Sequence, residues 1–241
     1  MCRPTVDQRP RAEFRRPVRI QMSSSTCAAE KSPRKCVVCM TGNRIFSTER
    51  MVVREWRAAD LAEFARMNAD PQVMRYFPET LSREQSDAFA QRIAAHFAEH
   101  GFGLWVVEIV DVAAFAGFVG LTRPRFETRF TPCVEIGWRL VRRYWGCGYA
   151  TEAAQAVVRH GFTSLGLNEI VSFTVPENRA SRRVMEKLGM HRDPAEDFDH
   201  PGLPAGHPLQ RHVLYRLARS NWSAAERDGV EDVRSGRRQA E

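Results

Sequence analysis

The stretch from Arg142 to Ala154, RRYWGCGYATEAA, combines residue types that are typical of a phosphate-binding loop. Gly146 and Gly148 stand one residue apart, arginines precede them, and helix-forming residues follow them. Main-chain N–H groups at the start of a helix, with no Cβ atoms in the way, form a positive pocket for phosphate oxygens. The stretch therefore predicts a bound phosphate, and the question is which molecule carries it.

Two common phosphate-bearing ligands do not fit this pattern. A dinucleotide loop of the form G-x-G-x-x-G requires a third glycine where this chain has Thr151, and the acidic residue expected at the end of the next strand is missing. A nucleoside triphosphate loop requires Gly-Lys followed by Ser or Thr, which this stretch lacks. A helix packed closely against a strand would also explain the glycines, without any ligand.

The segments around this loop predict a mixed α/β fold. Hydrophobic patterns, a capping box at Ser82–Gln85 and a C-cap at Gly189 define the expected elements. We expect strands at 51–56, 104–110, 115–121, 133–141, 169–175 and 212–219, and helices at 60–68, 82–99, 149–165 and 178–188. The helix at 149–165 makes the strands on either side of it a parallel pair, and the other strands pair mainly in the antiparallel sense.

Positive charge is concentrated at the N-terminal end of the chain. Residues 1–46 contain ten Lys and Arg against three Asp and Glu, which accounts for the whole net charge of +7. We expect 1–46 to be a disordered basic arm, or an over-long start, 47–222 to be one folded domain, and 223–241 to be a charged flexible tail. Because the folded part is formally neutral, its composition disfavours nucleic-acid binding.

The cysteines and histidines do not predict a metal centre. The pair in CVVC, Cys36 and Cys39, has no second cysteine or histidine pair to complete a zinc site. Three histidines between 200 and 212 lie at spacings that do not place them on one face. Since no apolar run approaches a membrane span, we expect a soluble cytoplasmic protein with reduced thiols, no metal and no membrane partner.

Several motifs together resemble the GCN5-related N-acetyltransferases, the GNAT superfamily. R-x-x-G-x-G at Arg143–Gly148, followed by YATEA, is similar to their acyl-CoA pyrophosphate loop, and PENRASRRVMEKLGM at 176–190 resembles their fifth strand and the next helix. EIGWRL before the loop and FDHPGLPAGHPLQRHVLYRL after it resemble the subgroup of ribosomal-protein N-terminal acetyltransferases. The resemblance covers about residues 48–222. It implies a mixed, mostly antiparallel central sheet with a parallel, splayed strand pair and flanking helices.

The resemblance implies acetyl-CoA as co-substrate, with its pantetheine arm between the strands that end near Val141 and Val175. The residues expected to contact it are Leu140, Val141, Arg143, Gly146, Cys147, Gly148, Tyr149, Ala150 and Asn178. The subgroup often has a lysine at the position of Cys147, which here offers only its main-chain N–H. We therefore expect weaker, but not abolished, phosphate binding.

The resemblance also implies where the acetyl transfer takes place. Glu135, on the strand before the loop, is the candidate general base, because an amine nucleophile must lose a proton. The alternative is a solvent-exposed strand glutamate, since the register of the strand is unknown. Gly137 would allow a bulge that presents an N–H group to the thioester carbonyl. Tyr76, Phe77 and Trp138 are candidates for acceptor binding.

The general acid departs from the usual family pattern. Met185 stands in the place where many members carry a tyrosine, and a thioether donates no proton. The Asn-x-x-Ser pattern at Asn178–Ser181 makes Ser181 the substitute. A purely structural role is the alternative, because Asn178 is a good N-cap and Ser181 falls at the third helical position.

These implications predict an acetyl-CoA-dependent N-acetyltransferase. It would move the acetyl group directly to a primary amine, on a protein N-terminus or a small molecule, in a ternary complex without a covalent enzyme intermediate. The alternative is a non-catalytic acyl-CoA-binding sensor on the same fold, which Met185 keeps open. The protein is expected to be a monomer or a homodimer.

Overall fold

A computed structural model describes residues 42–222 of the chain, so the predicted tail and most of the predicted arm lie outside the described residues. The first described strand, β1 (Arg44–Ser47), pairs antiparallel with β2 (Met51–Arg54). The sequence predicts that the folded domain starts at residue 47. In the structure it already includes residues 44–46, because β1 begins at Arg44. Ile45 and Phe46 are buried in the core, but a four-residue strand is too short to produce a recognisable hydrophobic period.

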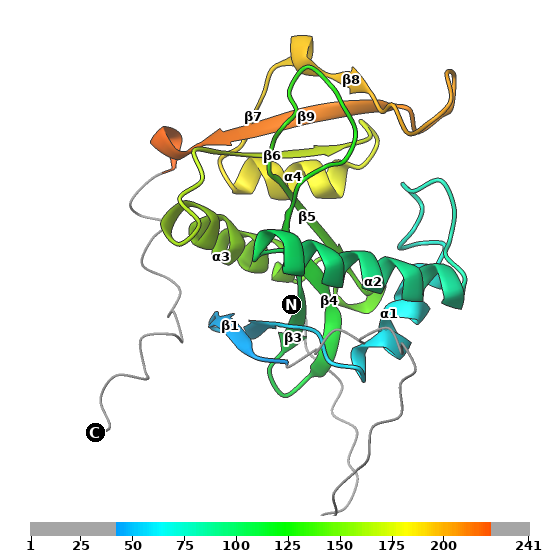
Figure 1. Cartoon of the computed structure of the whole chain (residues 1–241), viewed down its shortest axis with the longest axis vertical. Coiled ribbons are helices and arrows are strands. Elements are labelled where there is room, and N and C mark those ends of the chain that lie inside the picture. The colour runs from blue at the N-terminus through cyan, green and yellow to red at the C-terminus, as the bar shows by residue number, and fades with distance from the viewer. Residues whose placement is uncertain (1–41, 223–241) are drawn as a thin grey trace, which may run out of the picture. The chain divides into compact units, whose positions relative to one another are not determined.

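One mixed sheet runs through the molecule (Figure 1). Its other strands are β3 (Leu104–Ile109), β4 (Ala113–Thr122), β5 (Glu135–Leu140), β6 (Glu169–Thr174), β7 (His191–Arg192) and β9 (Arg211–Ala218). The strand order is β1-β2-β3-β4-β5-β6-β9-β7, and the short β8 (Phe198–Asp199) pairs only with β9. Every pair is antiparallel except β5 with β6. This confirms the predicted mixed fold with one parallel pair.

Within residues 42–222, four α-helices accompany the sheet. They are α1 (Asp60–Ala69), α2 (Arg83–His100), α3 (Tyr149–Thr163) and α4 (Arg179–Lys187). The predicted capping box is present at the start of α2, and Asn178 caps α4 by accepting from the N–H of Ser181. Gly189 ends the α4 region with a φ of 77°, as a C-cap glycine requires. Local chemistry therefore fixes these helix ends.

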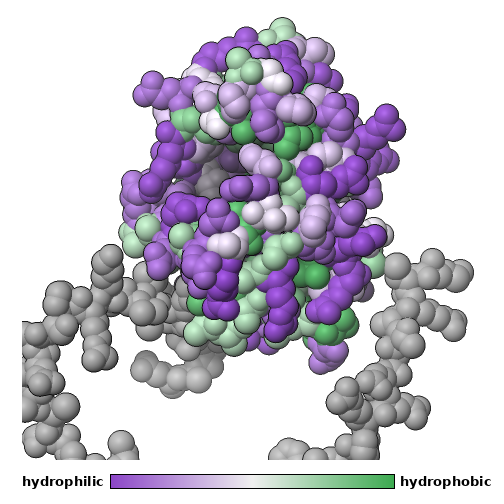
Figure 2. All heavy atoms as spheres, turned by 90° about the vertical axis from the view of Figure 1, so that its right-hand side faces the viewer, coloured by the Kyte–Doolittle hydropathy of each residue, from purple (hydrophilic) through white to green (hydrophobic). Residues whose placement is uncertain are grey.

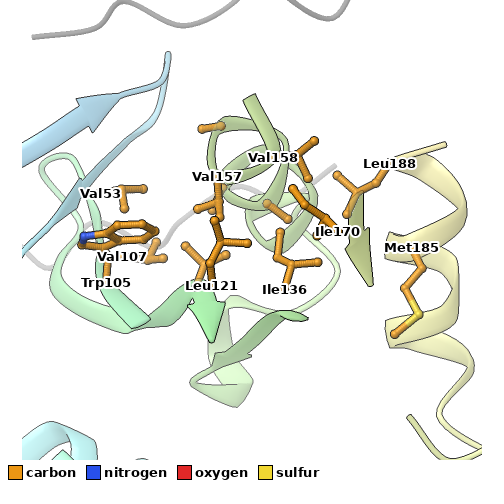
Figure 3. Close-up of a cluster of buried hydrophobic side chains, with 14 of the residues drawn as sticks. Val53, Trp105, Val107, Leu121, Ile136, Val157, Val158, Ile170, Met185 and Leu188 are labelled. Atoms are coloured by element: carbon orange, nitrogen blue, oxygen red, sulfur yellow. The ribbon is translucent and has the colours of Figure 1, made fainter. Parts of the chain in front are cut away.

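The hydrophobic core has a part on each face of the sheet. Side chains of α3 meet β4, β5 and β6, where Figure 3 shows Val157 and Val158 close to Leu121, Ile136 and Ile170. The helices α1 and α2 cover the other face, on which Phe64, Ile93, Val106 and Phe118 are among the buried residues. In the part of the chain from 42 to 222, no helix is both long enough and apolar enough to cross a bilayer.

Candidate active site

The parallel pair β5–β6 separates soon after it forms. Glu135 pairs with Val171, and the N–H of Val171 donates to the carbonyl of Val134 at 2.9 Å. The Ser172 hydroxyl then donates to the carbonyl of Ile136 at 2.9 Å. The main-chain N–H and C=O groups of every second residue in a strand point to the same side. After Ile136, the next residue of β5 whose main-chain groups face β6 is therefore Trp138. The strands thus leave an unpaired edge beyond Ile136, as predicted.

The glycine loop follows β5 directly and leads into α3. Gly146 and Gly148 have φ values of 73° and 84°, a conformation that residues with a Cβ atom rarely adopt. Gly148 is the N-cap of α3, and no side chain caps this helix. Side chains cap α2 and α4, whereas α1, like α3, begins without a side-chain cap. The first-turn N–H groups of α3 are therefore available to an anion at the positive end of the helix.

The β1–β2 connection supports this loop, a contribution that the sequence did not predict. Arg50 donates from Nη1 to the carbonyl of Cys147 at 3.0 Å and from Nε to the Glu152 carboxylate at 2.8 Å. Thr48 donates its hydroxyl hydrogen to the same carboxylate. The guanidinium of Arg50 also lies over the ring of Tyr149, 4.7 Å from its centroid. The loop is thus held from outside by residues about a hundred positions earlier in the chain.

The predicted CoA-contact residues lie on both sides of the splay. Leu140 is buried, and its carbonyl accepts from the indole of Trp145 at 2.8 Å, which directs the chain from β5 into the loop. Arg143 is exposed, with its guanidinium 4.8 Å from the ring centroid of Tyr144. Asn178 lies after β6, where its amide donates to Thr174 at 3.0 Å. The remaining predicted contact residues lie just after β5, in the loop and in the first turn of α3: Val141, Gly146, Cys147, Gly148, Tyr149 and Ala150.

Glu135 stands next to the point where the strands separate. It pairs with Thr122 of β4, and the register places it on the face opposite to α3, together with Gly137 and Arg139. Burial raises the pKa of Glu135 to about 8, although a hydrogen bond with Thr122 opposes this shift. A carboxyl group with a pKa near the working pH is suited to proton transfer.

One detail of the predicted site is wrong. The β4–β5 register is unbroken from Gly117–Leu140 to Thr122–Glu135, so Gly137 makes no bulge. Trp138, a candidate for acceptor binding, lies on the α3 side of the sheet, against the core. Because side chains alternate along a strand, Trp138 and Glu135 point to opposite faces of the sheet.

The predicted acceptor residues Tyr76 and Phe77 lie in the α1–α2 connection. The Tyr76 hydroxyl donates to the carbonyl of Glu177 at 3.0 Å, which joins this connection to the chain between β6 and α4. Phe77 lies over the guanidinium of Arg139, with 4.0 Å from ring centroid to Cζ. Figure 2 views the side that carries the α1–α2 and β8–β9 connections, and the surface there is hollowed between the upper and lower elements of Figure 1.

Ser181 and Met185 occupy different environments on α4. Ser181 is half-buried in the first turn, and its N–H group donates to Asn178 Oδ1 at 3.2 Å. Met185 is 1% exposed and packs in the hydrophobic core with Leu188 (Figure 3). At the place of the family tyrosine, the chain therefore has a core residue rather than a proton donor.

An aromatic and histidine cluster continues the face that carries Glu135. Phe130, Val171 and Phe198 form its core, and Val171 is the residue that pairs with Glu135. The rings of His200 and His212 lie 5.1 Å apart at its edge, and burial lowers the pKa of both. Within residues 42–222, no group of three or more His, Cys, Asp or Glu side chains could hold a metal ion. Sequence reasoning identified the histidines but missed the aromatic residues around them.

Comparison with known proteins identifies the family. A family model described as the acetyltransferase (GNAT) domain matches residues 50–191. The chain belongs to the GNAT family. The uncharacterized N-acetyltransferase YnaD of Bacillus subtilis (strain 168) is 30% identical over 178 residues, which cover 73% of this chain and 98% of that protein.

Solved GNAT structures share the fold. An acetyltransferase of the GNAT family from Bacillus anthracis is 26% identical, with a TM-score of 0.59 over 72% of this chain and 97% of its own. Mycobacterium smegmatis RimJ, in complex with CoA-disulfide, is 21% identical, with a TM-score of 0.61 over 77% of this chain and 95% of its own. GNAT membership makes acetyl transfer the general activity and acetyl-CoA the co-substrate, and the uncapped start of α3 and the unpaired edge of β5 fit such a donor.

Proposed function

We propose that this GNAT protein acetylates a primary amine by direct transfer from acetyl-CoA in a ternary complex, with Glu135 as the general base. The observation that carries the proposal is the place of Glu135. It lies on β5 at the last point of pairing with β6, where the strand edge that would receive the donor begins. Its raised pKa and its position at this edge together support proton transfer from an amine.

The donor half is supported by the glycine loop. The first-turn N–H groups of α3, together with the exposed Arg142 and Arg143, would hold the pyrophosphate. The unpaired main chain at Trp138 would hydrogen-bond the pantetheine arm as an added strand would. When bound, acetyl-CoA supplies the activated thioester, and the protein contributes position, a proton acceptor and the exclusion of water.

Glu135 would act on the acceptor before the bond to carbon forms. A primary amine is mostly protonated at neutral pH, with a pKa of about 8 for an α-amino group and about 10.4 for a lysine side chain. The ionised carboxylate takes one proton from the ammonium group, the neutral nitrogen attacks the thioester carbonyl, and the C–S bond breaks as the nitrogen loses its second proton. The CoA thiolate leaves with the electron pair and takes up a proton from the Ser181 hydroxyl, which we propose as the donor, and the proton released by the nitrogen restores that hydroxyl. Since a thiol has a pKa of about 8.5, this last proton transfer needs little assistance.

An enzyme is favoured over a non-catalytic acyl-CoA sensor. The alternative depended on Met185, but this side chain is part of the core and does not bear on whether Glu135 can act. The acceptor would be a protein N-terminus or a small-molecule amine, bound near Tyr76 and Phe77. A cytoplasmic location, and a monomeric or homodimeric state, are part of the same proposal.

Release of free CoA thiol from acetyl-CoA, measured against a panel of amines, tests the proposal. We expect amine-dependent release, and a loss of about 100-fold or more in kcat for Glu135→Gln, the range typical of a removed general base. Glu63→Gln, an exposed carboxylate on α1, is the matched control and should have no effect. Tight CoA binding without release for any amine would favour the sensor, and full activity of Glu135→Gln would remove Glu135 from the reaction.

A further inference from the structure

A buried arginine stands on the same face of β5 as the proposed base. Glu135, Gly137 and Arg139 alternate along the strand, and Arg139 pairs with Phe118 under the cover of α1 and α2. At about 3.3 Å per residue, the Cα atoms of Glu135 and Arg139 lie roughly 13 Å apart. One strand therefore carries a carboxyl group and a guanidinium that face the same side of the sheet.

Arg139 has no counter-ion among the described residues. It is 9% exposed, its Nη1 donates to the neutral Asn68 Oδ1 at 2.6 Å, and its Nε has no hydrogen-bond partner. The ring of Phe77 covers the guanidinium. Burial lowers the pKa of Arg139 to about 10, which still leaves the group positively charged at neutral pH.

The other deeply buried arginine of the fold shows how this chain compensates such a charge. Arg54 is 0% exposed and forms two hydrogen bonds of 2.8 Å with the carboxylate of Asp60. A third bond, of 2.7 Å, joins Arg54 to Glu108. Burying an unpaired charge is costly, and folded proteins normally supply a partner. The missing carboxylate at Arg139 therefore points to a partner that arrives with a ligand.

The strand between the two groups leaves room for such a ligand. A Cβ atom added at Gly137 would have only one heavy atom within 4 Å, Glu135 Oε1 at 4.0 Å. The surface above Gly137 is thus open, with an ionisable group at each end. The pantetheine arm of the donor carries no charge, and its phosphates are proposed to bind the loop at Arg143–Ala150, so we assign an anion at Arg139 to the acceptor.

We propose that Arg139 binds a carboxylate of the acceptor, so that the acceptor is an amine that also carries a carboxylate, as an amino acid does. The inference rests on the proposed function, because Glu135 defines where the amine lies. The same buried charge would repel polyamines. Arg139 would therefore act in choosing the substrate, not in the chemical step.

Matched pairs of acceptors test this directly. We would compare ω-amino acids of increasing chain length with alkylamines of the same length, since the pair differs only in the carboxylate. The wild-type chain is expected to prefer the amino acid, by kcat/KM, at one or more lengths. Arg139→Met should lower kcat/KM for that amino acid by about 10- to 100-fold, the loss expected for charge-assisted hydrogen bonds, and leave the alkylamine nearly unchanged.

A second variant and a second measurement keep the test independent of folding and turnover. Arg139→Lys retains the charge and much of the volume but lacks the forked donors, so it should fold and keep only part of the preference. Binding of hexanoate, a carboxylate without an amine, can be measured by calorimetry with CoA present, in the wild type and in both variants. We expect hexanoate binding that Arg139→Met abolishes and Arg139→Lys weakens.

Three results would overturn the inference. They are equal kcat/KM within every pair, hexanoate binding that is absent or unaffected by the variants, and weakened CoA affinity in Arg139→Met, which would place Arg139 at the donor. A complete lack of turnover with all amines, alkylamines included, would count against the proposed function instead. Hexanoate binding would then still decide the role of Arg139.

Discussion

The carbonyl oxygen of Cys147 accepts a hydrogen bond of 3.0 Å from Nη1 of Arg50, a residue 97 positions earlier in the chain. The same guanidinium forms an ion pair of 2.6 Å with Glu152 in the first turn of α3. Arg50 thus joins the glycine loop to α3, the helix that follows the loop. We regard Arg50 as a positioning residue, which orients the main-chain donors of the loop without contacting the acetyl group.

Replacing Arg50 with alanine is therefore expected to weaken CoA binding. The loop would lose its external hydrogen bonds, and ordering it on binding would cost more, so we expect CoA affinity to fall by about 10-fold. Arg57→Ala is the matched control, since Arg57 is similarly exposed (46% against 43%) and pairs with Glu108 away from the loop. Calorimetric titration with CoA measures both. Equal affinities in the two variants would show that the loop needs no support from Arg50.

Gly148→Ala is expected to damage the loop in two ways. The φ of 84° is strained for alanine, and the added Cβ would lie 3.3 Å from Arg50 Nη2. Gly101→Ala is the matched control, because Gly101 has a φ of 73° but open space around it and caps α2. Chemical denaturation should show that each costs about 1 kcal/mol of stability. Only Gly148→Ala should also lose CoA affinity, and a comparable loss for Gly101→Ala would argue against a local effect.

The pH dependence of acetylation follows from Glu135. Burial raises its pKa to about 8, and only the ionised form accepts a proton, so kcat/KM should increase with pH up to about 8. Because the amine also titrates in this range, the profile should be recorded for two amines of different pKa. The step that belongs to Glu135 should stay at the same pH for both amines and be absent in Glu135→Gln. A step that moves with the amine alone would contradict this origin.

The same carboxyl group should make folding stability depend on pH. The pKa of Glu135 is higher in the folded state than its usual value of 4.5, so the folded state holds a proton that the unfolded state releases. Its contribution is most favourable below pH 4.5 and is lost as the pH rises toward 8. Relative to the wild type, Glu135→Gln should therefore gain stability between pH 5 and pH 8. Urea denaturation at several pH values measures the difference, and parallel curves would show an ordinary pKa.

Ser181→Ala tests whether Ser181 acts as the general acid or only has a structural role at the start of α4. If the hydroxyl protonates the leaving thiolate, kcat should fall, but by no more than about 10-fold because a thiolate needs little assistance, and stability should change little because the cap bond uses the main-chain N–H of Ser181. Asn178→Ala is expected to behave differently, costing about 1 kcal/mol through loss of the N-cap. Single-turnover kinetics and thermal unfolding of both variants provide the comparison. Unchanged kcat in Ser181→Ala would leave Ser181 with a structural role only.

Local features of this protein were predictable from its sequence. Gly146 and Gly148, the cap at Asn178 and the capping box at Ser82 depend on backbone geometry within a few residues. The parallel pair followed from the helix that connects its strands, because a crossover of that kind forces parallel pairing. Features determined within one or two turns of chain can be read from residue types alone.

Features that depend on register or on distant contacts were not predictable. The alternation of β5 places Trp138 away from Glu135, and the position of Glu135 became clear only from its pairing with Thr122. Arg50 meets the loop through tertiary packing that no spacing along the chain reveals. The burial of Arg139 without a counter-ion is likewise a property of the assembled sheet and helices, since an arginine on a strand usually predicts an exposed residue.

The parallel strands β5 and β6 pair at one position, Glu135 with Val171, and this has a consequence for the stability of the fold. The sheet is nearly two half-sheets, β1–β5 and β6–β9, because the edge between them closes at one end only. A donor that occupies this edge would complete the hydrogen bonding that the chain leaves unfinished, and binding energy of this kind adds directly to folding energy. CoA would then be a structural element of the fold as well as a reactant. The concentration of acetyl-CoA in the cell would in this way set the fraction of the protein in which the two half-sheets are held together.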